Sequence, residues 1–265
     1  MCEERDGWSD AAPPAPVFAN VWFVGTCGIS AILITGDKGH VLIDGGPRDA
    51  APLVLANIWR LGIDPKQVRW ILSSHEHYDH AGAIRALQRA TGAKVAALAT
   101  EKASLEVGRM STQDPQNDGK GTFDSVRVDK VVQDGESLVL GRLVLTAHAT
   151  PTHSPGSTSW TWQACTAAFN CRMVAYADSA TVISTDAYRF TDHPERIAAA
   201  RAGLETIAAL PCDVLITPHP SASNLFARLA GKAPLVDPGA CQTYAAAART
   251  RLADRLRGEA AGSAK

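Results

Sequence analysis

The densest potential chemistry in the sequence lies in one six-residue segment, which contains four side chains of the kinds that bind metals: His75, His77, Asp79 and His80. The apolar run RWILSS before it predicts a buried strand, and AIRALQRATG after it predicts a helix that ends at Gly92. In an extended turn His75 and His77 point the same way, while Asp79 and His80 reach a second point nearby. Imidazole nitrogens and carboxylate oxygens suit zinc, so the segment predicts a zinc site at a strand end.

Two further histidines follow predicted strands. His153 lies in the turn TPTHSPGS and His219 in the turn TPHP. Both turns are rich in proline and could bring an imidazole to the same rim. An isolated histidine is more often a surface residue or a satisfied core residue, so spacing alone leaves both readings equally open here.

Asp44 ends the predicted strand GHVLIDGG. A carboxylate at a strand end near the metals could fix the ring of a ligating histidine. An aspartate that only caps the turn into Gly45 and Gly46 explains the pattern equally well.

The elements around these residues alternate between strand and helix. In the first half, strands are expected at 17–25, 28–35, 39–46, 69–74 and 94–99, helices at 51–62 and 83–92, and a polar loop at 109–125. In the second half, strands are expected at 126–132, 137–149, 157–164, 172–179 and 213–220, and helices at 193–210 and 241–260. This order predicts an α/β protein with sheets between helical layers, although periodicity alone fits one four-layer domain or two α/β domains.

Composition limits the classes of partner. The chain has 265 residues, of which 46% are hydrophobic and 20% charged, and its formal net charge is -1. Interspersed charges of both signs give no electrostatic argument for nucleic acid or an anionic membrane as partner. No apolar run approaches the ~20 residues that span a bilayer. A small-molecule substrate is therefore expected.

Six cysteines are dispersed along the chain without a CxxC pair: Cys2, Cys27, Cys165, Cys171, Cys212 and Cys241. An even, dispersed set favours disulfides and an oxidising compartment. We therefore expect a mature exported protein, periplasmic or secreted, to which Met1 was added for expression. Six buried free thiols in a cytosolic enzyme are the alternative, and the sequence does not choose among the 15 possible pairings.

The segment HEHYDH resembles the HxHxDH signature of the metallo-β-lactamase superfamily. VLIDGG, PTHSPGS, YADS and TPHP follow in that family's order, so the resemblance covers nearly the whole chain. VGTCGIS, STSWTW and DSA are similar to the subclass B3 enzymes. The resemblance implies a four-layer αββα sandwich formed by a single domain over residues 1–265, with two pseudo-equivalent halves that meet near 135–150.

The resemblance also implies the role of individual residues. One zinc ion would be held by His75, His77 and His153, and a second by Asp79, His80 and His219. Asp79 would in addition orient the attacking hydroxide. The residues implied as substrate contacts are Ser179, Thr181 and Gln116. The implied disulfides are Cys2–Cys27, Cys165–Cys171 and Cys212–Cys241, with lipid attachment at Cys2 as an alternative.

The activity implied is a zinc-dependent β-lactamase that confers antibiotic resistance. Two zinc ions would share a water and lower its pKa towards ~7, and the resulting hydroxide would open the lactam of penicillins, cephalosporins and carbapenems. A monomer is expected. The same fold also serves hydrolases of thioesters and lactones, in which an aspartate typically bridges both metals, and Asp178 lies next to Ser179. A binding protein with structural metals is a third possibility, but six ligands for two metals leave open positions.

Thr152 departs from the family pattern, which usually has glycine before this histidine. If the position requires a positive φ, a β-branched residue is strained there and the loop that carries His153 is displaced.

Overall fold

The computed structural model describes residue 2 and residues 5–262, so Met1 lies outside the described residues. Within that part of the chain, the strands form two sheets. The first sheet follows chain order: β1 (Ala15–Phe18), β2 (Val21–Phe23), β3 (Ile32–Ile34), β4 (His40–Ile43), β5 (Val68–Leu72), β6 (Lys94–Leu98) and β7 (Lys130–Val132). The second has the order β12-β11-β10-β9-β8 and comprises β8 (Ser137–Leu140), β9 (Leu143–Ala149), β10 (Thr158–Cys165), β11 (Cys171–Tyr176) and β12 (Val214–Ile216).

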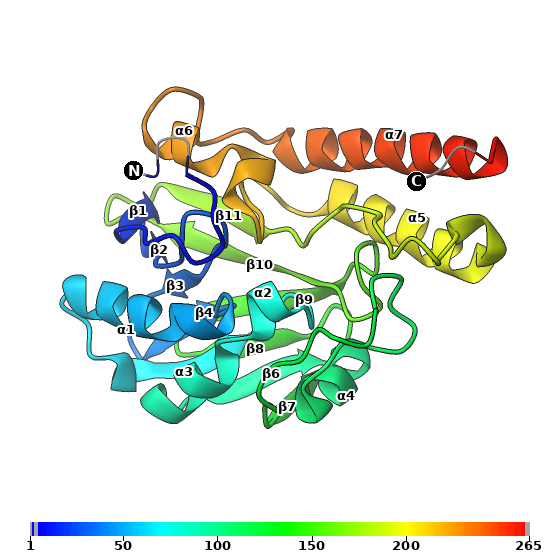
Figure 1. Ribbon diagram of the computed structural model, residues 1–265. Coiled ribbons are helices and arrows are strands. Elements are labelled where there is room, and N and C mark those ends of the chain that lie inside the picture. Colours follow the sequence, from blue (N-terminus) through cyan, green and yellow to red (C-terminus); the bar gives the residue numbers. More distant parts are fainter. Residues whose placement is uncertain (1, 3–4, 263–265) are drawn as a thin grey trace.

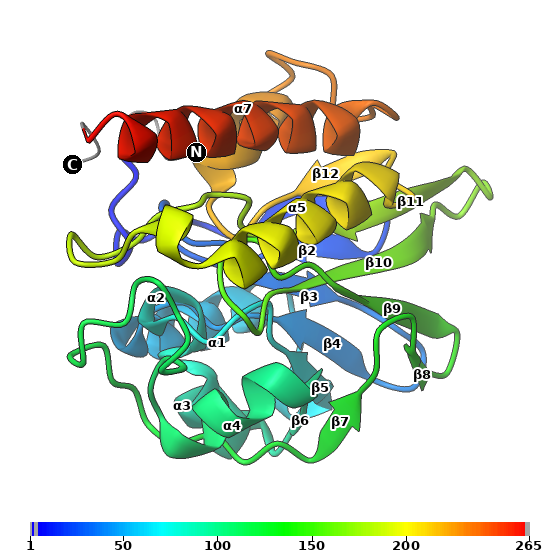
Figure 2. The same cartoon turned by 90° about the vertical axis from the view of Figure 1, so that its right-hand side faces the viewer.

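Helices cover the outer face of each sheet, which gives the expected αββα order of layers (Figure 1). The first sheet is covered by α1 (Ala51–Arg60), α2 (Tyr78–Ala81), α3 (Ile84–Thr91) and α4 (Ala99–Val107). Figure 2 shows α5 (Pro194–Ala209) and α7 (Ala240–Ala260) running along the opposite side, over the second sheet. The short α6 (Leu225–Leu229) lies between β12 and α7 in the chain, and single 3-10 turns occur at Arg48–Ala50, Pro65–Gln67, Phe190–Asp192 and Pro220–Ser223.

Three apolar clusters separate these layers. The central cluster lies between the sheets and includes Phe23, Trp160 and Tyr176. A second cluster packs the first sheet against α1, α3 and α4, and a third packs the second sheet against α5 and α7. Burial of apolar area on both faces of each sheet stabilises the sandwich at roughly 25 cal/mol per Å². The sheets thereby give the site a rigid support.

All six cysteines are paired in the structure, in the pattern implied by the resemblance: Cys2–Cys27, Cys165–Cys171 and Cys212–Cys241. The disulfide prediction is confirmed, and both alternatives, free thiols and lipid attachment at Cys2, are wrong for this structure because each sulfur is engaged. No helix among the described residues has both the length and the apolar character that crossing a membrane requires.

Several expected elements have different bounds. The strand expected at 17–25 is a hairpin, β1 and β2, because Ala19 adopts a positive φ of 50° and reverses the chain. The run 137–149 is likewise two strands, separated where Gly141 has a φ of 59°. Of the strand expected at 126–132, only Lys130–Val132 pairs with a neighbour. Helix α4 was not expected, since its residues continue an apolar strand without a polar capping residue.

Candidate metal centre

The candidate site lies where several strands end. His75, His77, Asp79 and His80 follow β5, His153 follows β9, Asp178 follows β11 and His219 follows β12. These strands come from both sheets. The site therefore forms only when the two sheets pack together, which brings residues more than 140 positions apart in the chain into contact.

His75, His77 and His153 form one cluster, in which one nitrogen of each ring lies within 4.8 Å of those of the other two. All three rings are buried. In two of the three rings, one nitrogen forms a hydrogen bond with an aspartate outside the cluster. His75 Nδ1 lies 2.8 Å from Asp178 Oδ1, and His77 Nε2 lies 2.8 Å from Asp114 Oδ2. His153 Nδ1 instead contacts Thr181, 2.9 Å from its carbonyl oxygen and 2.8 Å from its hydroxyl. His75 Nε2, His77 Nδ1 and His153 Nε2 are thus left to face the centre.

Burial and neighbouring charges control the protonation of this cluster. Burial, together with the charges of neighbouring histidines, holds the pKa of His75 well below its ordinary value and lowers the pKa of His153 to about 4. Burial also opposes the charged form of His77, but the hydrogen bond and charge of Asp114 outweigh it and raise the pKa of His77. At neutral pH His75 and His153 are therefore neutral, the form that binds a metal.

Asp79, His80 and His219 form the second cluster, and their candidate ligand atoms also lie within 4.8 Å of one another. Asp79 Oδ2 is 3.1 Å from His80 Nε2 and 3.4 Å from His219 Nε2. Burial alone raises the pKa of Asp79, but the charges of His80, His75 and His219 together lower it below its ordinary value. The carboxylate is therefore ionised. The ring centroids of His75 and His80 are 4.3 Å apart, so the two clusters are adjacent.

The donor set fits two metal ions. His75 Nε2 is buried and has no hydrogen-bond partner within the described part of the chain. Such an unpaired buried acceptor costs ~1–3 kcal/mol unless a cation or a donor meets it. Together the clusters offer five imidazoles and one carboxylate, a set suited to zinc. That these six residues bind metal stays a prediction.

Asp44 lies close to His80 of the second cluster and has a left-handed backbone conformation, with a φ of 60°. Its carboxylate accepts hydrogen bonds from the Ser74 backbone N–H and hydroxyl at 2.8 and 2.7 Å, and from the Tyr176 hydroxyl at 2.7 Å. His80 Nδ1 is 3.7 Å away, too far for a hydrogen bond. Asp44 thus fixes the segment that leads into the ligands and acts on His80 by charge, and a direct bond to a ligand ring is not formed.

The residues expected to contact substrate lie at the same rim. Ser179 is buried beside Asp178, and Gln116 Nε2 is 3.3 Å from His153 Nε2. The Thr181 hydroxyl is engaged with His153, as described above. Their contacts with substrate stay predictions. Sequence reasoning missed Trp8, a half-exposed residue whose ring centroid is 6.1 Å from that of His219.

Two buried glutamates, Glu76 and Glu101, lie near the candidate ligands. Glu76 Oε2 accepts a hydrogen bond from Ser154 at 2.8 Å, and burial raises the pKa of Glu76 to about 7. Burial, reinforced by the charge of Glu76, raises the pKa of Glu101 on α4 well above 4.5. The buried site thus favours the protonated, neutral form of the Glu101 carboxyl.

We expect Glu101→Gln to gain stability relative to the parent as the pH rises, when both proteins are free of metal. The quantity compared is the free energy of unfolding. The folded parent keeps a proton on Glu101 that the unfolded chain releases above pH 4.5. The parent's free energy of unfolding therefore loses about 1.4 kcal/mol per pH unit above that value, up to the folded-state pKa. Glutamine does not titrate and escapes this loss. Urea unfolding at pH 5 and pH 7 measures the difference, with the exposed Glu106→Gln on the same helix as control. An equal advantage at both pH values would contradict the expectation.

The strain expected at Thr152 is not found. Thr152 does not belong to the described residues with positive φ, and His153 reaches its cluster. The Thr152 hydroxyl donates to the Ala200 carbonyl at 3.2 Å, and Arg196 donates to the Pro151 and Thr152 carbonyls at 2.6 and 2.7 Å. Helix α5 thus holds the backbone before the ligand and accommodates the larger residue.

Gly203 on α5 provides the space for Thr152. A Cβ atom at position 203 would lie 2.5 Å from Thr152 Oγ1 and 2.9 Å from the Thr150 carbonyl carbon. We therefore expect Gly203→Ala to lower the free energy of unfolding by about 1–3 kcal/mol through overpacking. Adding Thr152→Gly should recover part of this loss, because it removes one of the two clashes. Thermal denaturation of the single and double variants measures both effects, and an unchanged melting temperature in Gly203→Ala would rule out the tight contact.

Comparisons with known proteins agree with this geometry. A family model described as the metallo-beta-lactamase superfamily matches residues 24–219. The chain is 61% identical to the metallo-beta-lactamase MIM-1 from Novosphingobium pentaromativorans, with a TM-score of 0.97 over 99% of this chain and 97% of that one. It is 39% identical to MEM-A1, a subclass B3 metallo-beta-lactamase isolated from a soil metagenome library, with a TM-score of 0.92 over 97% and 100% of the two chains.

Curated relatives match over shorter regions. A probable metallo-hydrolase from Burkholderia pseudomallei strain 1710b is 30% identical over 168 residues, which are 57% of this chain and 53% of that protein. The chain spans about half the length of the curated relatives it matches.

Proposed function

Because the chain belongs to the metallo-beta-lactamase superfamily, we propose that it is a subclass B3 β-lactamase that uses two zinc ions to hydrolyse penicillins, cephalosporins and carbapenems, and so confers resistance to them. The observation that carries the proposal is the pair of adjoining clusters, three histidines in one and Asp79, His80 and His219 in the other. When bound, zinc ions lower the pKa of water towards ~7 and polarise the carbonyl that is attacked.

The residues of the chain supply position and charge. Asp178, Asp114 and Thr181 hold the three histidine rings of the first cluster in the tautomers that point one nitrogen inward. The Asp79 carboxylate, kept ionised by its histidine neighbours, accepts a hydrogen bond from the attacking water and orients it. We expect Ser179, Thr181 and the Gln116 amide to contact the substrate. Ser179 follows Asp178 in the chain, and Gln116 Nε2 is 3.3 Å from His153 Nε2. No side-chain nucleophile is required.

A thioesterase or lactonase of the same fold is the competing reading. It requires an aspartate shared by both metals, and Asp178 is the candidate. Asp178 instead contacts His75 through Nδ1, the nitrogen that faces away from the cluster centre, and it belongs to neither group of candidate ligands. This placement supports the β-lactamase.

The test is hydrolysis of a chromogenic cephalosporin and of a carbapenem by purified protein, with and without a chelator and with zinc added back. We expect turnover of both compounds, loss of turnover on chelation and recovery with zinc. Zinc-loaded protein that hydrolyses thioesters or lactones but neither β-lactam would overturn the proposed substrate class.

We also propose that the protein acts as a single-domain monomer in the periplasm or outside the cell. Three disulfides support an oxidising compartment. Fractionation of cells that express the gene, with light scattering of the purified protein, tests both points.

A further inference from the structure

A short backbone segment after β11, residues 178–181, orients two of the proposed ligands. Asp178 Oδ1 contacts His75 Nδ1 at 2.8 Å, and Thr181 contacts His153 Nδ1 through both its hydroxyl and its carbonyl. We call residues 178–181 the orienting segment. A displacement of this segment would turn both imidazoles away from the cluster centre.

One hydroxyl from a distant helix holds the middle of the orienting segment. The Tyr244 hydroxyl, on α7, accepts a hydrogen bond from the Ala180 backbone N–H at 3.0 Å and donates to the Asp178 carbonyl at 3.3 Å. The three residues are buried, and Asp178 and Ala180 are fully so. A buried N–H and carbonyl without these bonds would have to find other partners, so the phenol fixes the segment at two points.

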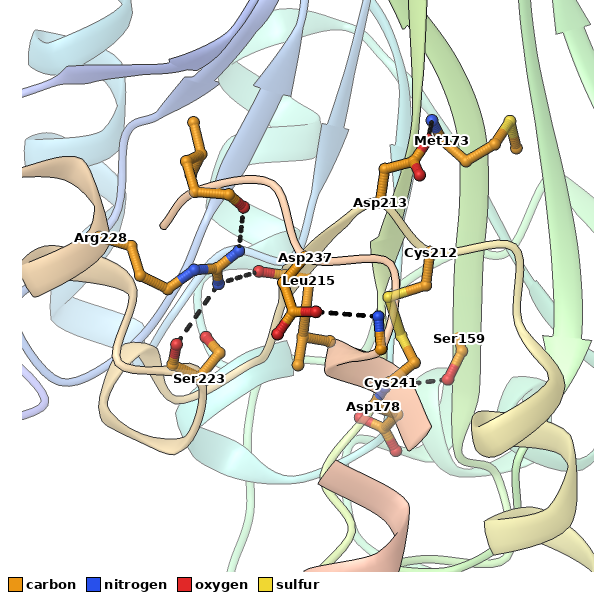
Figure 3. The surroundings of a disulfide bond; sticks show 12 residues. Ser159, Met173, Asp178, Cys212, Asp213, Leu215, Ser223, Arg228, Asp237 and Cys241 are labelled. Carbon is orange, nitrogen blue, oxygen red and sulfur yellow. Dashed lines mark hydrogen bonds between the residues drawn. A yellow bond between two sulfur atoms is a disulfide. The ribbon is translucent and has the colours of Figure 1, made fainter. Parts of the chain in front are cut away.

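A disulfide anchors the helix that carries Tyr244. Cys241 lies one turn before Tyr244 at the start of α7 and is bonded to Cys212. Figure 3 shows this disulfide near Asp178, with Asp213 next to it in the chain. Asp213 is itself fixed to β11, because its carboxylate accepts from the Met173 N–H at 2.8 Å and its own N–H donates to the Met173 carbonyl at 2.8 Å. The start of α7, and with it Tyr244, is therefore connected to the second sheet through the disulfide and Asp213.

We propose that Tyr244 is a positioning residue for the first ligand cluster, and that the Cys212–Cys241 disulfide keeps it in place. This inference rests on the proposed function only in requiring that the histidine clusters bind metal. Tyr244 acts on His75 and His153 through the orienting segment and touches neither ring. The affinity of the first cluster for metal thus depends on a helix on the outer face of the molecule.

The test uses Tyr244→Phe, which removes one oxygen atom, and Co²⁺ as the probe. Chelator-treated protein is titrated with Co²⁺ against a chromophoric chelator, and the visible absorption of the bound ion is recorded. Outer partners of metal ligands typically contribute 10- to 100-fold to affinity, and we expect the variant to bind one of its two ions about tenfold more weakly, with an altered spectrum. The control is Thr250→Val, which removes an exposed hydroxyl from the same helix α7, and it should match the parent.

Unchanged Co²⁺ affinity and spectrum in folded Tyr244→Phe would overturn the proposal, even if the variant melts at a lower temperature. If Tyr244→Phe does not fold, the paired variant Cys212→Ser and Cys241→Ser replaces it. Weaker binding of one Co²⁺ ion then supports the proposal, and parental binding overturns it. Parent protein that binds two Co²⁺ ions but opens no β-lactam would contradict the proposed substrate and leave the role of Tyr244 standing.

Discussion

Asp79→Ala is expected to bind one metal ion per chain where the parent binds two, and to lose roughly a thousandfold or more in kcat/KM for a cephalosporin. Asp79 Oδ2 lies within 3.4 Å of both histidines of the second cluster, and it is the only carboxylate in that group of candidate ligands. Removing it deletes both a candidate ligand and the group that orients the attacking water. Metal analysis after dialysis and steady-state kinetics measure the two losses.

The matched control is Asp254→Ala, which removes an exposed carboxylate from α7 and should behave as the parent. Asp79→Ala protein with two bound zinc ions and full activity would refute both roles of Asp79. A variant that keeps two ions but loses activity would separate orientation of the water from metal binding.

Asp178→Ala is expected to weaken binding at the first cluster about 10- to 100-fold, because an outer carboxylate fixes the tautomer and ring angle of a ligating histidine. The Asp178 carboxylate is fully buried against His75. Its loss leaves the His75 Nδ1–H without its aspartate acceptor, at a cost of ~1–3 kcal/mol in the free energy of unfolding. Zinc affinity by competition and urea denaturation of metal-free protein measure these effects.

Asp178→Asn provides the discriminating comparison. Asparagine retains an oxygen that can accept from His75 Nδ1, so this variant should retain more affinity than Asp178→Ala. If Asp178 were a ligand shared by both metals, both substitutions would remove both ions together, and the assignment made from the His75 contact would be wrong.

The clustering of the four neighbouring candidate ligands was predictable because these residues are close in the sequence. His75, His77, Asp79 and His80 required only the rule that side chains two apart point the same way and that a strand precedes them. His153 and His219 could be proposed as ligands only through the family resemblance, since their convergence depends on the packing of the two sheets. The layers followed from the alternation of strands and helices, which burial on both faces of each sheet enforces.

The residues that hold the candidate ligands in place were harder to predict from the sequence. Asp114 lies in a polar loop with several similar residues, and Tyr244 lies in a helix whose sequence is mostly alanine and charged residues. Nothing local distinguishes an aspartate that meets a histidine 37 positions away from one that meets water. The β1–β2 hairpin was missed for a related reason: Ala19 adopts a left-handed conformation that glycine, asparagine or aspartate would have signalled.

Because every cysteine of the chain is bonded to another, the folded protein presents no thiol of its own. A cysteine introduced at Thr112, in the polar loop near Asp114, would be its only nucleophilic sulfur under non-reducing conditions. A maleimide dye attached there would report whether this loop moves during turnover, without competing labels. The same complete pairing makes the protein a suitable scaffold for site-specific conjugation.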